Sequence, residues 1–239
     1  MNGRKIAHAG GAIDGIKYSN SLNAIRASAA KTNLIELDIV MAADGAIVAH
    51  DGHEEKYGVT GRFDALPVSA FRDMRYSGQF QSLSIYDLAL LSVGMDCKFI
   101  LDIKPKAQGY KDVLVLIAAA CQKFGVFDKF IIQVYSRDDF YATSHYPFHG
   151  IMIAFWKNFR NIFSQSATRF FRTCVKQDPA KFIAASVNFK RIFQDGKIVD
   201  IADQNFFRGS GVTIFIHGQP KKHEAALLDA GYGLFTHTP

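Results

Sequence analysis

The sequence predicts a (β/α)8 barrel of the α/β class, a TIM barrel, built as one domain over residues 1–239. Short strands alternate with helices along the chain, which implies a parallel sheet with right-handed crossovers. Eight such strands can be counted, and this length suits one α/β barrel. Several strands end in ionisable side chains, at the end where these folds place their sites. An open doubly wound sheet is the alternative.

The strands are expected where apolar and β-branched residues run or alternate between turn signals. Asp44 and Gly45 turn the second strand back through Ile47 and Val48 to His50. Residues 52–80, rich in glycine and charge, are expected to form an elaborated loop over the site. The barrel strands are expected to start at Ile6 and then to cover residues 34–40, 98–103, 130–135, 150–155, 182–187, 212–216 and 233–236.

Helices are expected where apolar residues recur at three- and four-residue steps. Residues 159–176 carry a phenylalanine-rich stripe with basic residues around it. A helix that lies on an anionic membrane has the same pattern. Since every outer helix of a barrel packs an apolar stripe on the sheet, packing is favoured over membrane contact. The helices are expected at residues 22–31, 84–91, 111–124, 138–145, 159–176, 198–209 and 221–230.

Charge and cysteine content indicate which binding partners and which cellular location to expect. The formal net charge is +6, which favours an anionic partner: a phosphate ester, nucleic acid or an acidic membrane surface. The basic residues are dispersed, so no nucleic-acid partner is expected. Three widely spaced cysteines form neither a disulfide framework nor a zinc pattern. With no signal peptide or membrane-spanning run recognisable, a reducing, cytoplasmic location is expected; the oligomeric state is left open.

The stretch from Leu34 to Gly52 carries the main chemical signal. In a strand, Glu36 and Asp38 share one face while the apolar residues between them take the other. Two carboxylates so close repel each other unless a cation binds them, and Mg²⁺ and Ca²⁺ prefer oxygen ligands. His50 returns to the neighbourhood of these acids. The alternative is an edge hairpin whose solvent face is acidic.

An ordered series of motifs resembles the glycerophosphodiester phosphodiesterase family. The likeness is dense over the first 105 residues and returns at the end of the chain. It rests on Ile6-Ala7-His8-Ala9-Gly10, Asn20-Ser21-Leu22, Ile35-Glu36-Leu37-Asp38, Asp44-Gly45, Val48-Ala49-His50-Asp51, Leu101-Asp102-Ile103-Lys104-Pro105 and the segment from Ala230 to Pro239.

The resemblance implies a barrel that hydrolyses glycerophosphodiesters with a bound divalent cation. A cation and a lysine can neutralise the phosphate oxygens, while two histidines move protons. Which histidine is the acid and which is the base stays open, as does the choice among Mg²⁺, Ca²⁺ and Mn²⁺. By position, the acid/base pair is His8 and His50, the metal ligands are Glu36, Asp38 and Asp102, and the substrate-binding candidates are Lys104, Asn20 and His217.

The chain also departs from the family pattern. Ala9 stands where the family has a phosphate-binding arginine, which a lysine does not replace geometrically. Ser19 replaces a glutamate, His217 lies in a segment where the family has Trp-Thr-Val-Asn, and His237 replaces an aspartate. A divergent enzyme with an altered substrate is therefore expected. Two alternatives are a phospholipase-type barrel enzyme that forms a cyclic phosphate and a phosphate-ligand binder without catalysis.

Overall fold

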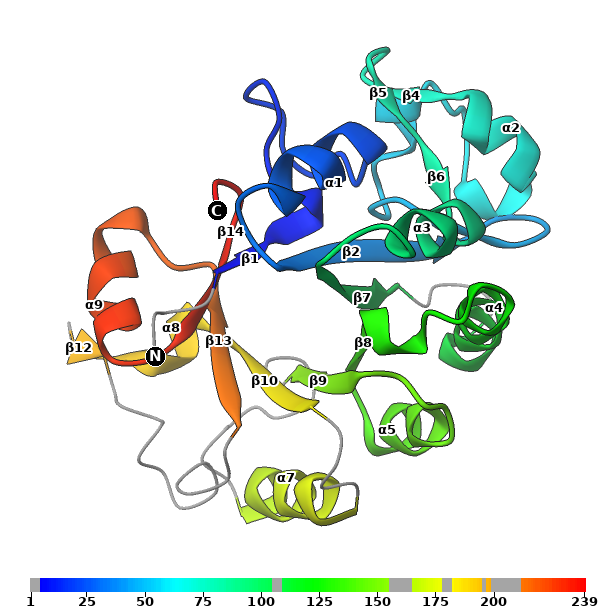
Figure 1. Cartoon of the computed structure of the whole chain (residues 1–239). Coiled ribbons are helices and arrows are strands. Elements are labelled where there is room, and N and C mark those ends of the chain that lie inside the picture. The colour runs from blue at the N-terminus through cyan, green and yellow to red at the C-terminus, as the bar shows by residue number, and fades with distance from the viewer. Residues whose placement is uncertain (1–4, 105–108, 155–164, 178–181, 195–196, 199–211) are drawn as a thin grey trace. The chain divides into compact units, whose positions relative to one another are not determined.

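In the part of the chain that the structure describes, eight barrel strands alternate with helices, and the fold class is the predicted (β/α)8 barrel (Figure 1). The computed structural model describes residues 5–104, 109–154, 165–177, 182–194, 197–198 and 212–239. The barrel strands are β1 (Lys5–Ala7), β2 (Leu34–Met41), β7 (Lys98–Ile103), β8 (Phe130–Val134), β9 (Gly150–Ala154), β10 (Phe182–Asn188), β13 (Thr213–His217) and β14 (Gly233–Thr236).

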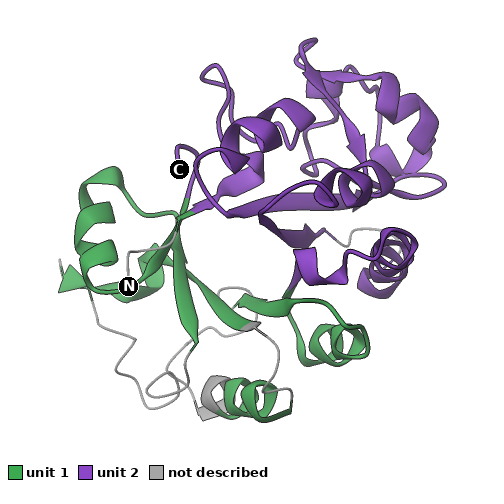
Figure 2. Ribbon diagram, in the orientation of Figure 1, with its two compact units in different colours: residues 1–5, 133–235 green, residues 6–132, 236–239 purple. Residues whose placement is uncertain are grey.

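The chain groups into two compact units, which Figure 2 distinguishes by colour. Unit 1 comprises residues 1–5 and 133–235, and unit 2 comprises residues 6–132 and 236–239. The last residues of the chain thus belong with its first half. This division places most of the predicted site residues in unit 2.

In unit 2, parallel pairing aligns the strands that carry the acidic residues. Ala7 of β1 pairs with Ile35 of β2, and Asp38 of β2 is in register with Asp102 of β7. An antiparallel hairpin turns β2 back, as predicted. The further elements of this unit are β3 (Ala46–Val48) and β6 (Leu83–Ser84), with the helices α1 (Leu22–Ala29), α2 (Val68–Asp73), α3 (Ile85–Ser92) and α4 (Tyr110–Phe124).

Local sequence signals explain where these helices begin and end. The Ser21 side chain caps α1 by accepting a hydrogen bond from the Ala24 N–H at 3.2 Å. Ser84 and Asp87 form a reciprocal capping box at the start of α3. Gly125 ends α4 in the left-handed conformation, with φ of 68°.

Strand β2 is buried on both faces, which decides between the two interpretations of its acidic residues. Its partners β7 and β3 flank it, and Glu36 and Asp38 are only 2% and 1% exposed. The alternative of a solvent-facing acidic edge hairpin is therefore wrong. Buried carboxylates require compensation by cations or hydrogen-bond donors.

Residues 52–80 contain short elements packed on a local apolar cluster with β2 and β3. These elements are the 3-10 helices η2 (Glu54–Tyr57) and η3 (Phe63–Ala65), helix α2, and the hairpin of β4 (Arg75–Tyr76) and β5 (Phe80–Gln81). The buried cluster includes Val40, Ile47, Ala49, Tyr57, Val59, Phe63, Phe71, Tyr76 and Phe80. Packing in this cluster therefore fixes the positions of Tyr57 and Tyr76.

In unit 1, β9, β10, β13 and β14 pair in parallel in that order. Phe170, Phe171 and Cys174 of α7 are buried, so this helix packs its apolar face. The start of the predicted 159–176 helix and residues 199–209 of the predicted 198–209 helix lie outside the described residues. The other elements are α5 (Arg137–Ser144), α7 (Gln165–Gln177), α8 (Phe189–Ile192), α9 (Glu224–Asp229), β11 (Phe193–Gln194) and β12 (Lys197–Ile198).

Sequence patterning missed the short elements of this unit. Helix α8 and the β11–β12 hairpin are two to four residues each, too short to show a hydrophobic period. Ile198, expected to start a helix, instead ends β12.

Among the described residues, no helix combines the length and hydropathy that crossing a membrane requires. All three cysteines are buried as free thiols. The cytoplasmic location stays a prediction.

Candidate active site

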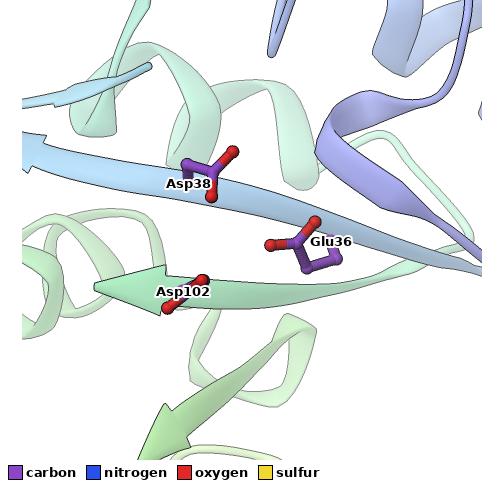
Figure 3. Close-up of side chains that lie close together, drawn as sticks. All are labelled: Glu36, Asp38 and Asp102. Atoms are coloured by element: carbon purple, nitrogen blue, oxygen red, sulfur yellow. The ribbon is translucent and has the colours of Figure 1, made fainter. Parts of the chain in front are cut away.

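Three buried carboxylates meet where β2 and β7 run side by side. Glu36 and Asp38 project from β2 and Asp102 projects from β7 (Figure 3). One potential ligand atom from each lies within 4.8 Å of the others. The two-residue spacing puts Glu36 and Asp38 on one face, and the parallel register brings Asp102 beside Asp38. The predicted acidic cluster is therefore assembled by the pairing of two strands.

Lys104 supplies a positive charge to this cluster. Its Nζ lies 2.9 Å from Asp38 Oδ1 and also forms an ion pair with Asp102 Oδ2. Burial by itself would lower the pKa of Lys104, but Asp38, Asp102 and Glu36 outweigh it and raise that pKa. Lys104 therefore stays protonated.

Glu36 experiences the excess negative charge of the cluster. Burial raises its pKa well above the usual value, and the charges of Asp38 and Asp102 raise it further. The Lys104 ammonium and the Ala9 N–H, which donates to Glu36 Oε2 at 2.7 Å, oppose that shift. Three carboxylates against one ammonium leave two uncompensated negative charges when all are ionised.

The residues of the cluster fit a hard divalent cation. All three ligands are oxygen donors, the set that Mg²⁺ and Ca²⁺ prefer, and a divalent charge would balance the excess. Among the described residues, Asp38 Oδ1 is a buried oxygen with no hydrogen-bond partner, and Lys104 is its ion-pair partner. A cation bound here would compensate this oxygen further.

Asn20 orients Asp38 from both ends of its amide. Its Nδ2 donates to Asp38 Oδ2 at 3.0 Å, and its Oδ1 accepts from the Asp38 N–H at 3.0 Å. Both bonds are buried, and Asn20 itself is 0% exposed. The structure therefore shows Asn20 as a hydrogen-bond partner of the acidic cluster, and its role in binding substrate stays a prediction.

His8 adjoins the acidic cluster at the end of β1. Its Nε2 lies 3.8 Å from Glu36 Oε2. The next residue, Ala9, has a left-handed φ of 51° and is fully buried, so its N–H points to Glu36 while its side chain offers nothing to a ligand. The missing arginine is thus not replaced at this position.

His50 is held in one tautomer by its own chain. Its Nδ1 lies 2.7 Å from the Asp51 carbonyl oxygen and 3.4 Å from Asp51 Oδ1. A carbonyl oxygen only accepts hydrogen bonds, so Nδ1 carries the hydrogen. In the neutral ring Nε2 then holds the lone pair and can accept a proton.

Two further histidines, which sequence reasoning did not place in the site, stack on these two. The His237 ring stacks on His8 with centroids 4.9 Å apart, and the His53 ring stacks on His50 at 4.7 Å. Burial, and then the charge of Lys17, lower the pKa of His237; burial, and then His50, lower that of His53. The spacing of His53 three residues after His50 was the available signal.

The structure thus brings together seven of the eight predicted site residues within unit 2. The eighth, His217, ends β13 in unit 1, where its Nδ1 lies 3.5 Å from Asn188 Nδ2. Its role in binding substrate stays a prediction. The seven are His8, Asn20, Glu36, Asp38, His50, Asp102 and Lys104.

Solved structures of other proteins share this fold. No family model and no curated protein sequence matches the chain. Among solved structures, an Oleispira antarctica phosphodiesterase in complex with the product sn-glycerol-3-phosphate is similar over 100% of this chain and 94% of its own, with a TM-score of 0.76 and 12% identity.

Two further solved structures extend this comparison. A glycerophosphoryl diester phosphodiesterase from Parabacteroides distasonis is 14% identical over 100% of this chain and 84% of its own, with a TM-score of 0.73. A glycerophosphodiester phosphodiesterase from Agrobacterium tumefaciens is also 14% identical, over 98% and 95%, with a TM-score of 0.61. The resemblance stated from the sequence is therefore confirmed at the level of the fold.

Proposed function

We propose that this chain is a metal-dependent phosphoric diester hydrolase whose substrate is a glycerophosphodiester or a related small phosphodiester. The observation that carries the proposal is the buried cluster of Glu36, Asp38 and Asp102 with Lys104 paired to two of its members. The three similar solved structures described above are of phosphodiesterases, one of them in complex with the product sn-glycerol-3-phosphate.

In this proposal Glu36, Asp38 and Asp102 hold one divalent cation, Mg²⁺ or Ca²⁺. The bound cation supplies charge neutralisation for the phosphate as negative charge builds up in the transition state. Lys104 contributes a second positive charge beside it. Asn20 keeps Asp38 in its orientation by two hydrogen bonds.

We assign the two histidines different proton roles. His50, with its hydrogen on Nδ1, presents the Nε2 lone pair and removes a proton from the attacking hydroxyl or water. His8, with Nε2 close to the Glu36 carboxylate, donates a proton to the leaving oxygen.

The test measures hydrolysis of a glycerophosphodiester by purified protein after removal of metal with EDTA and after return of Mg²⁺, Ca²⁺ or Mn²⁺. We expect metal-dependent release of the alcohol, reduced about 10²–10⁴-fold in His50→Ala. His145→Ala, at an exposed position outside the site, is the matched control. No release with any of the three metals would contradict the proposal.

Two alternatives are distinguished by the product. A cyclic phosphate, detected by ³¹P NMR, would indicate a phospholipase-type reaction in which a substrate hydroxyl attacks. The buried Ala9 in place of the family arginine favours, as a second candidate, a phosphate binder without turnover. Binding of a phosphodiester without product release would support that candidate.

A further inference from the structure

Tyr18, which no motif marks, has an unusual backbone conformation close to the proposed site. Its φ is 61°, in the left-handed region that aromatic side chains rarely adopt. Ala9 and Asn20, which enclose the same loop, also have positive φ, of 51° and 49°. Such conformations persist only where surrounding contacts fix them, and they cluster at functional sites.

The carbonyls on either side of Tyr18 are anchored by two tyrosines from the 52–80 segment. Tyr57 Oη donates to the Ser19 carbonyl at 3.0 Å, and Tyr76 Oη donates to the Lys17 carbonyl at 3.3 Å. Because both tyrosines belong to the local apolar cluster, the loop is held from a rigid base. The position of the Tyr18 ring is therefore imposed by the fold.

The Tyr18 ring contacts four imidazoles. Its centroid lies 5.3 Å from His8, 5.7 Å from His50, 6.0 Å from His53 and 4.6 Å from His237, all in edge-on arrangements. Edge-to-face packing is a favourable geometry for aromatic rings. Tyr18 thus touches both proposed proton-transfer residues and the two histidines stacked on them.

The Tyr18 hydroxyl is in a position to serve a ligand. Among the described residues, Tyr18 is hydrogen-bonded through its carbonyl, to Asn20 Nδ2 at 3.5 Å, and no group hydrogen-bonds to its hydroxyl, although the residue is partly buried. Burial, followed by the charges of Asp38 and Glu36, raises the pKa of Tyr18. The phenol therefore stays protonated at neutral pH and lies within electrostatic reach of the acidic cluster.

We propose that Tyr18 is a further substrate-contacting residue, which donates a hydrogen bond from its hydroxyl to an oxygen of the phosphate group and fixes the separation of His8 and His50 with its ring. The proposal rests on the proposed function and names one more group of the same site. It addresses a gap in that site, because Ala9 brings no guanidinium and Lys104 is engaged with Asp38 and Asp102.

The chemistry of the donor indicates the ligand class. A neutral hydroxyl binds a phosphodiester monoanion without adding charge, whereas an arginine clamp binds through two charged hydrogen bonds. The Tyr18 hydroxyl thus suits the phosphodiester monoanion of the proposed function.

The direct test compares Tyr18→Phe with wild type in the metal-loaded protein. Phenylalanine keeps the ring contacts and removes only the hydroxyl, so we expect kcat/KM to fall about 10–100-fold with an unchanged Tm. Tyr86→Phe, on the exposed side of α3, is the matched control and should leave kcat/KM unchanged. Tyr18→Ala removes the ring too and should lower kcat further than Tyr18→Phe does.

Binding of inorganic phosphate, measured by calorimetry on the same proteins, separates this proposal from the proposed function. If wild type binds phosphate but hydrolyses no diester, the proposed function fails, and a weaker phosphate affinity in Tyr18→Phe still supports the role of Tyr18. Wild-type kcat/KM and phosphate affinity in Tyr18→Phe would overturn the role of Tyr18. Absence of phosphate binding by metal-loaded wild type would overturn both.

Discussion

Replacing Lys104 with methionine tests whether the acidic cluster depends on positive charge. The substitution keeps the unbranched apolar part of the side chain but removes the ammonium paired with Asp38 and Asp102. Asp38 is 1% exposed as a side chain, so its charge is left in a buried environment. Breaking a buried ion pair from one side costs about 3–5 kcal/mol. We therefore expect Lys104→Met to lose about that much unfolding free energy in EDTA.

The matched control is Lys98→Met, which removes the same group from a surface pair. Lys98 Nζ lies 3.5 Å from Asp128 Oδ2, and Asp128 is 64% exposed. Such pairs contribute about 0–1 kcal/mol. Any general effect of the Lys→Met exchange should appear in both variants.

The assay is denaturant unfolding in EDTA and in saturating Mg²⁺. A ligand present at about 100 times its dissociation constant stabilises by roughly 2.7 kcal/mol. Mg²⁺ should therefore stabilise wild type and Lys98→Met to the same extent, because both keep the acidic cluster, and should narrow the gap between Lys104→Met and wild type, because the divalent charge replaces the lost ammonium. Equal, small losses in both variants, or no recovery with any divalent cation, would refute the electrostatic account of the cluster.

Three further predictions concern the same unit. The pKa of Glu36 in the folded protein is raised above its usual value of 4.5, so this group contributes stability below pH 4.5 that is lost as pH rises through the folded pKa. Over that pH range we expect metal-free wild type to lose unfolding free energy relative to Glu36→Gln. Denaturant unfolding at successive pH values measures the difference. Asn20→Ala removes two buried hydrogen bonds to Asp38 and should lower the free energy of unfolding by about 2–4 kcal/mol, measured with denaturant. The control Asn23→Ala loses one exposed hydrogen bond and should lower that free energy by under about 1 kcal/mol. Gly11→Ala should lower the unfolding free energy by about 1–3 kcal/mol, because the φ of Gly11 is 87° and a Cβ there would collide with Ser28 Oγ. An unchanged Tm would contradict this prediction.

The pairing of Glu36 with Asp38 on one face could be predicted from the alternation in their strand. Asp102 as a third ligand came from the resemblance to the phosphodiesterase family, and the parallel register that places it beside Asp38 is seen only in the structure. The return of the chain to His50 followed from one turn signal. The alternation and the turn are local patterns.

Tyr18 and His237 could not be predicted, because their positions depend on tertiary structure. Nothing in a sequence marks a tyrosine that adopts φ of 61° while its neighbours Ser19 and Lys17 accept hydrogen bonds from Tyr57 and Tyr76, which lie 38 and 59 residues further along the chain. The His237 ring stacks on His8 because residues 236–239 pack in unit 2, although they are at the other end of the sequence. Long-range contacts of this kind leave no period in the sequence.

The most direct test of the central claim is the anomalous diffraction of manganese in crystals of this protein soaked with Mn²⁺. We predict one strong peak within about 2.0–2.6 Å of an oxygen from each of Glu36, Asp38 and Asp102. A peak elsewhere, or none at the cluster while Lys104 keeps both of its carboxylate partners, would contradict the metal site on which the proposed reaction depends.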